Sequence, residues 1–218
     1  MTKMKALIEN NYFTVVVAGH DALPSFYDEF KNEFRIFEKY KLDYIDEKSA
    51  RELIEDPIRY EDGSSRYQPG AVDLILKMTA CSPFYIQIVC DEIVKYANEN
   101  KCSPITIPDV NDVYNKLITN QGSISFGDFD NLISSGDGKL NPKAVENTYR
   151  VLQDIAVRTR SQEYCKQKDI YVFGKEDERI IKDLKERDVV VEDKQYVGEK
   201  RIKIKVELFK NWINNNEN

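Results

Sequence analysis

The sequence contains a single histidine, His20, among 218 residues. A metal centre built on several histidines is therefore excluded, and a Ser-His or Cys-His nucleophile could use only this one ring. The four cysteines are widely spaced and form none of the C-x-x-C pairs typical of zinc sites. We interpret Cys81, Cys90, Cys102 and Cys165 as reduced, structural thiols.

Long apolar runs are also missing. No stretch approaches the roughly 20 apolar residues that a membrane helix needs, and the N terminus lacks the apolar region of a secretory signal. We therefore expect a cytoplasmic protein with no membrane contact. With 41% apolar and 32% charged residues, the composition is typical of a soluble globular protein with one large or two small domains.

The chain has no phosphate-binding loop of the form Gly-x-x-x-x-Gly-Lys-Ser/Thr, in which backbone N–H groups wrap the phosphates and a hydroxyl reaches Mg²⁺. The chain has two Gly-Lys pairs, and neither fits. Gly138-Lys139 is followed by Leu140 and Gly174-Lys175 by Glu176, and Ile133 and Asp169 occupy the positions of the first glycine. By itself, this chain is therefore not expected to hydrolyse a nucleoside triphosphate. We assign it no catalytic residue, no metal and no cofactor of its own.

The net charge of −6 is unevenly distributed. Residues 141–218 hold 17 of the 32 basic and 15 of the 38 acidic residues, so they carry +2 and the first 140 residues carry −8. An acidic surface repels a polyanion. Any contact with nucleic acid would therefore come from the last third of the chain.

The first strong pattern is the Val-rich run FTVVVAG over 13–19, which is apolar on both faces and rich in β-branched residues. It is typical of a buried inner strand of a parallel sheet. Only twelve residues precede it, so we expect that the other strands were lost by truncation upstream. Residues 1–45 are then a remnant of an α/β core.

Apolar spacing and helix breakers divide the rest of the chain. Asp46 caps a helix that ends before Pro57, and further helices are expected over 71–79 and 84–99. Another helix begins within 105–110, with Thr106 or Asp109 near its start, and runs to about Leu117. We group these helices as a helical domain, 46–118. The Gly- and Ser-rich segment that follows, 119–140, is interpreted as a linker or a partly ordered bridge between domains.

Residues 141–218 read as three helices and a β-hairpin, the composition of a winged helix. The expected elements are helices over 142–159, 162–167 and 176–187, strands over 189–191 and 201–206, and an amphipathic tail over 207–214. The fold class expected for the whole chain is mainly α with minor β.

Several segments, in this order, resemble the C-terminal half of ATPases of the AAA+ superfamily and of its STAND branch, the signal-transduction ATPases with numerous domains. FTVVVAG (13–19) resembles the sensor-1 strand, the last strand of the ATPase core. LDYIDEKSARELIEDPI (42–58) resembles the segment that begins the helical lid, and TACSPFYIQIVC (79–90) resembles the Gly-x-Pro motif of the lid. ITIPDV (105–110) resembles the start of the last lid helix, and LFKNWI (208–213) resembles the end of the winged helix. The resemblance covers nearly the whole chain.

The resemblance implies a remnant of an α/β ATPase core, a helical lid and a winged-helix domain that relay the nucleotide state to a protein partner. It implies nucleotide-binding positions at Gly19 and His20 on the sensor-1 strand and at Ser82 and Pro83 in the lid, all in the intact protein. ATP and Mg²⁺ are expected only together with the missing N-terminal P-loop region, which is itself an implied partner.

The sequence departs from this family at the turn before Pro83. The family has a Gly-rich turn there, whereas this chain has Ala80-Cys81-Ser82. Two plainer interpretations stay open: Pro83 is a first-turn proline without further function, and His20 lies in a polar turn.

The alternative function is a winged-helix DNA-binding module or a protein-interaction adaptor. Lys200, Arg201, Lys203 and Lys205 form a basic edge and are candidate nucleic-acid contacts, or they protect an edge strand from pairing. The preceding helix and its flanks carry five basic and six acidic residues over 175–188. This balance predicts a solvated face rather than a groove-binding helix, so any DNA contact would be weak.

Overall fold

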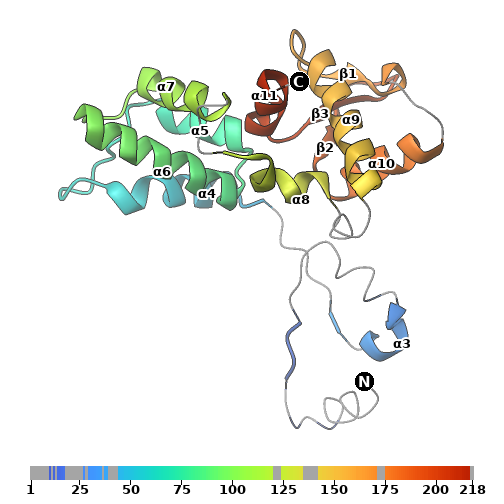
Figure 1. Ribbon diagram of the computed structural model, residues 1–218. Helices are drawn as coiled ribbons and strands as arrows, with labels where there is room; N and C mark the ends of the chain where they lie inside the picture. The colour runs from blue at the N-terminus through green and yellow to red at the C-terminus, as the bar shows by residue number, and fades with distance from the viewer. Residues whose placement is uncertain are drawn as a thin grey trace.

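The structure is a computed structural model, and its fold is mainly helical with a small three-stranded antiparallel sheet, which confirms the expected mainly α class with minor β. It describes residues 10, 12, 14–17, 27, 29–35, 37–38, 44–119, 124–134, 142–170 and 175–216. Residues 44–119 form what we call the helical lobe, and residues 142–170 and 175–216 form the sheet lobe (Figure 1).

The helical lobe contains α4 (Glu47–Glu55), α5 (Ala71–Thr79), α6 (Pro83–Asn100) and α7 (Ile107–Leu117). Local capping sets where these helices begin. The Asp46 carboxylate accepts a hydrogen bond from the Ser49 backbone N–H at 3.0 Å, and Thr106 and Asp109 form a reciprocal capping box at the start of α7. Such caps satisfy backbone donors that have no partner within the helix.

The sheet lobe contains α9 (Pro142–Arg158), β1 (Cys165–Lys166), α10 (Lys175–Glu186), β2 (Val190–Glu192), β3 (Arg201–Ile204) and α11 (Glu207–Asn215). The sheet order is β1-β3-β2, and both pairings are antiparallel. Ile202 of β3 lies opposite Cys165 on one side and Glu192 on the other. Ile202 and Ile204 are buried, whereas Arg201 and Lys203, which alternate with them, are half-buried.

The helix expected over 162–167 is wrong. This segment instead enters β1, followed by a 3-10 turn over Gln167–Asp169. A six-residue segment is too short to be a stable helix by itself, because nucleation is costly. Pairing of Cys165 and Lys166 with β3 therefore decides its conformation.

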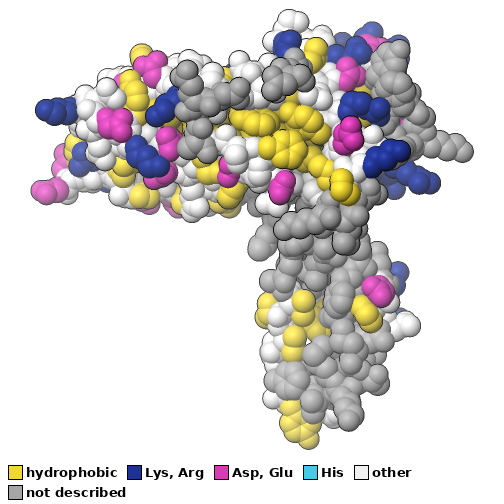
Figure 2. All heavy atoms as spheres, in the orientation of Figure 1, with side chains coloured by type: hydrophobic (Ala, Val, Ile, Leu, Met, Phe, Trp, Pro, Cys, Tyr) yellow, Lys and Arg dark blue, Asp and Glu magenta, His cyan; other side chains and the backbone are white. Residues whose placement is uncertain are grey.

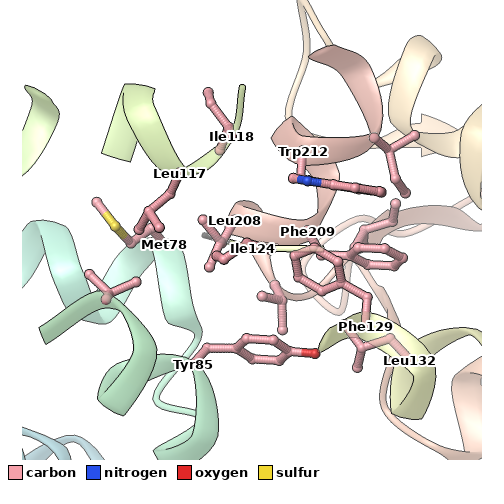
Figure 3. Close-up of a cluster of buried hydrophobic side chains, with 14 of the residues drawn as sticks. Met78, Tyr85, Leu117, Ile118, Ile124, Phe129, Leu132, Leu208, Phe209 and Trp212 are labelled. Atoms are coloured by element: carbon pink, nitrogen blue, oxygen red, sulfur yellow. The ribbon is translucent and has the colours of Figure 1, made fainter. Parts of the chain in front are cut away.

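Two short helical elements, a 3-10 turn over Phe126–Phe129 and α8 (Asp130–Ile133), lie between the lobes (Figure 1). Phe129 is completely buried. The centroid of its ring lies 5.6 Å from that of Tyr85, 4.6 Å from Phe209 and 5.2 Å from Trp212 (Figure 3). The described part of the region expected as a linker is therefore packed into the core.

Helix α11 also joins the two lobes. Asn211 donates a hydrogen bond from Nδ2 to the Tyr114 hydroxyl at 2.5 Å, and Asn216 donates to the Ile118 carbonyl at 3.0 Å. Leu208, which is completely buried, lies between α11 and the helical lobe (Figure 3). The buried apolar side chains form one cluster that includes residues of both lobes.

The Val-rich run near the N terminus differs from the buried strand that we expected. Within the described residues 14–17 there is no strand, and Val16 is 89% exposed. Residues 14–17, the described part of the run, are therefore not a buried strand in this structure. A strand is buried only when neighbouring strands and covering helices surround it, and the strands of the described residues all belong to the sheet lobe.

Candidate functional site

The best-defined candidate site is the turn between α5 and α6, residues Ala80–Pro83, which we call the lid turn. Ala80 ends α5 with φ 52°, and Cys81 follows with φ 60°. The Ser82 backbone N–H donates to the Thr79 carbonyl at 3.0 Å, and Pro83 is the first residue of α6. Ser82 is buried and Pro83 is half-buried.

The backbone of the lid turn adopts a conformation that normally favours glycine. Two consecutive residues with side chains, Ala80 and Cys81, occupy the left-handed region, where a Cβ atom costs roughly 1–2 kcal/mol per residue. Glycine would adopt this backbone path without that cost.

We expect Ala80→Gly to raise the free energy of unfolding by about 0.5–1 kcal/mol. Glycine removes the steric cost of positive φ, and its greater freedom in the unfolded chain offsets part of the gain. Chemical denaturation measures this change. The matched control is Ala97→Gly inside α6, which should lower stability by about 1 kcal/mol; a loss of stability for both variants would contradict the left-handed assignment.

Three residues from distant parts of the chain adjoin the lid turn. The Ile45 backbone N–H donates to the Cys81 carbonyl at 3.3 Å. The Lys205 ammonium group lies 3.5 Å from the centroid of the Tyr44 ring, next to Ile45. Burial raises the pKa of the Cys81 thiol, and the nearby Lys205 cation partly opposes this rise. A residue of the sheet lobe therefore lies close to the lid turn.

The other two nucleotide-binding candidates, Gly19 and His20, lie outside the described residues. The structure therefore does not test whether they lie near Ser82 and Pro83, and all four assignments stay predictions.

The four candidate nucleic-acid contacts each have a partner within the chain. Lys200 lies 3.9 Å from a Glu192 carboxylate oxygen, and the Arg201 guanidinium stacks 3.7 Å from the Tyr196 ring centroid. Lys203 and Lys205 have separate partners, described next. Partners of this kind compete with phosphate for the cations.

Lys203 donates to a Glu163 carboxylate oxygen at 2.5 Å and lies 4.5 Å from the ring centroid of Tyr164. Lys205 points instead toward Tyr44 of the helical lobe. The partner of Lys205 therefore belongs to the helical lobe, whereas the other three basic residues have partners within the sheet lobe.

The interpretation of these basic residues as protection for an edge strand is wrong, because β3 is the central strand of the sheet. Next to this strand lies an open hollow of about 660 Å³, lined by four acidic and three basic side chains together with Gln162, Tyr164 and Gln195. On the visible face of the sheet lobe, acidic side chains lie among the basic ones (Figure 2). This surface is mixed in charge, so it does not attract a polyanion strongly.

Sequence reasoning missed the partners of the cations. Tyr44, Tyr164 and Tyr196 each present a ring face to a basic side chain. Pairing of Lys203 with Tyr164 and of Lys205 with Tyr44 depends on contacts across many residues of sequence. A usable local signal exists only for Tyr196, which lies five residues before Arg201 on the same hairpin.

The described cysteines lack the features of a nucleophile. All four are free thiols, and burial raises the pKa of Cys90 and of Cys165 to about 11. Thiols with such pKa values are protonated at neutral pH and react slowly. Among the described residues, no group of three or more His, Cys, Asp and Glu side chains is arranged to hold a metal ion.

The fold and the site thus define a mainly helical protein with a small antiparallel sheet and a strained turn at the start of its longest described helix. Comparison with protein families, curated proteins and solved structures finds no match to this chain. None of the helices in the described part of the chain combines the length and the apolar character that a membrane crossing requires.

Proposed function

We propose that this chain is the lid and winged-helix part of a P-loop ATPase of the AAA+ or STAND type, which relays the nucleotide state to a protein partner and is not catalytic alone. The observation that carries the proposal is the lid turn. A left-handed turn followed by a first-turn proline, with Ser82 and Pro83 at the start of α6, is the local geometry that the Gly-x-Pro motif of the family leads one to expect.

The element order of the sheet lobe supports the winged-helix part of this proposal. A helix, a short strand, a 3-10 turn, a second helix and a hairpin follow one another, and the first strand pairs with the last. A winged helix has this order, with a full helix in place of the 3-10 turn.

The junction between the lobes supports the relay. The side chains around Phe129 and Leu208 join both lobes in one buried cluster. Close-packed interiors transmit displacement because they have few voids to absorb it. A movement of the lid on nucleotide binding would therefore carry the sheet lobe with it.

The test is nucleotide binding by an N-terminally extended protein that includes the P-loop core the proposal requires. This protein should bind ATP in a Mg²⁺-dependent manner, whereas residues 1–218 alone should not. Pro83→Asp should weaken binding by about tenfold, because it places a carboxylate at the proposed adenine contact. Isothermal titration calorimetry measures both affinities.

The matched control for Pro83 is Pro108→Asp, which changes the same residue type in the first turn of α7, away from the lid turn. It should leave ATP affinity unchanged. Absence of ATP binding by the extended protein would remove the ATPase proposal altogether.

The alternative is an adaptor that binds another protein through the wing. Val197, at the turn between β2 and β3, is 98% exposed, and the neighbouring Tyr196 is 44% exposed. Apolar side chains at an exposed tip favour a protein partner over DNA, and the mixed charge of the adjoining hollow points the same way.

The DNA version of the alternative predicts a salt-dependent affinity for duplex DNA, and we expect that affinity to be absent. At low salt, fluorescence anisotropy with a labelled duplex should detect no binding tighter than about 10⁻⁴ M, because the basic residues are already paired. Binding in the micromolar range that Lys203→Glu abolishes would favour the DNA-binding module instead.

A further inference from the structure

Lys205 belongs to the sheet lobe, but its side chain contacts the helical lobe. It follows β3, and its backbone N–H donates to the Val189 carbonyl at 2.9 Å, which anchors it to the sheet. Its ammonium group, however, lies 3.5 Å from the ring centroid of Tyr44. A half-buried cation over an aromatic face is an attractive contact, and stronger than one at a fully exposed site.

Tyr44 in turn is next to the residue that holds the lid turn. The Ile45 backbone N–H donates to the Cys81 carbonyl at 3.3 Å, and Asp46 then caps α4. Ile45 and Cys81 both pack against the buried core. Residues 44–46 therefore lie next to the lid turn. Asp46 fixes one end of this segment as the cap of α4, and the Lys205 side chain covers Tyr44 at the other end.

The lid turn needs such support, because Ala80 and Cys81 occupy backbone conformations that residues with a Cβ atom disfavour. Strained conformations of this kind persist only where surrounding contacts hold them. The hydrogen bond from Ile45 to Cys81 is one of these contacts.

We propose that Lys205 is a positioning residue for the lid turn, which it holds through Tyr44 and Ile45, rather than a nucleic-acid contact. The purpose of this coupling rests on the proposed function: it connects the sheet lobe directly to the turn that would face the nucleotide. The coupling itself is a property of this chain and is testable without nucleotide.

The experiment measures the rate at which Cys81 reacts with iodoacetamide in residues 1–218, with each cysteine followed separately by mass spectrometry. Lys205→Met removes the cation and keeps a long apolar side chain. We expect the reaction of Cys81 to become roughly 3- to 10-fold faster, because the turn opens more often once Tyr44 is released. Lys205→Arg keeps the cation over the ring and should react at the original rate.

The direction of the change in the reaction rate of Cys81 distinguishes an opening of the lid turn from the electrostatic effect of losing the Lys205 charge. The Lys205 charge lowers the pKa of Cys81, so removal of the charge alone would raise that pKa, reduce the thiolate fraction and slow the reaction. An increase in rate therefore reports a structural opening of the turn.

Two internal controls complete the design. Lys203→Met removes a cation of β3 that lies over Tyr164 within the sheet lobe, and should leave Cys81 unchanged. Cys165, which is buried in the sheet lobe, reports global unfolding and should keep its rate in every variant.

A second variant, Tyr44→Leu, should speed the reaction of Cys81 as much as Lys205→Met does, and the double variant should add nothing further. The proposal is overturned if Lys205→Met leaves Cys81 unchanged or slower, if Lys203→Met has the same effect, or if Cys165 accelerates in parallel. Failure of ATP binding by the extended protein would leave this result intact, so the two proposals fail separately.

Discussion

Phe129→Ala is expected to lower the free energy of unfolding by about 3–5 kcal/mol, the range for a buried phenylalanine whose removal leaves a cavity. Phe129 is completely buried and its ring contacts aromatic rings from both lobes. Guanidinium denaturation followed by the fluorescence of Trp212, the single tryptophan, measures the loss directly, because the Trp212 ring centroid lies 5.2 Å from that of Phe129.

Phe126→Ala is the matched control, since it removes the same side chain from the same 3-10 turn at a position that is 40% exposed. Its loss should be about 1–2 kcal/mol, because less apolar area leaves water on folding and no closed cavity forms. Equal losses for the two variants, or a loss below about 1 kcal/mol for Phe129→Ala, would show that this segment is a spacer rather than part of the core.

Leu208→Asp is expected to have the second large effect, a loss of more than about 4 kcal/mol. Leu208 is completely buried between α11 and the helical lobe (Figure 3). An aspartate there would have to bury a charge among apolar side chains or open the contact between the lobes. Far-UV circular dichroism during denaturation and limited proteolysis between the lobes both report the outcome.

The control for Leu208 is Asn215→Asp, which adds the same charge at an exposed position near the end of α11. Its cost should stay below about 1 kcal/mol, the range for a carboxylate near a helix C terminus. If Leu208→Asp retains wild-type stability, the two lobes are independent, and the relay in the proposed function loses its physical basis.

Together, these two predictions test whether the lobes unfold as one unit. A single cooperative transition, identical by fluorescence and circular dichroism, is expected when one core includes both lobes. The arrangement matters for the proposed function, because a lid that moves with its neighbour transmits a displacement, whereas loosely tethered lobes do not.

The helices of the helical lobe could be predicted from the sequence because their signals are local. Asp46, Pro83 and Thr106 stand at helix starts, where a capping side chain or a fixed φ angle acts within one turn of the backbone. The predicted α5 agrees with the observed helix at both ends, and α9 and α10 agree to within one residue. The alternation of charged and apolar residues likewise predicted β3, because successive residues of a strand face opposite sides of the sheet.

Only part of the lid turn could be predicted from the sequence. The position of Pro83 after a helix break indicated a turn, but Ala and Cys are residues that normally avoid positive φ. The residue types at positions 80 and 81 therefore gave no sign of the left-handed backbone path that the structure shows. Contacts from Ile45, some 36 positions away in the chain, help to hold this path.

By itself, the sequence determined the helical periodicity, the caps, the mainly α class and the absence of a phosphate-binding loop, since each depends on residues that are close together in the chain. The tertiary structure decided the rest: the burial of Phe129, the central place of β3, the pairing of the basic residues and the reach of Lys205 to Tyr44. These features depend on which surfaces meet after the chain has folded. A lysine looks the same in sequence whether solvent, a carboxylate or an aromatic ring becomes its neighbour.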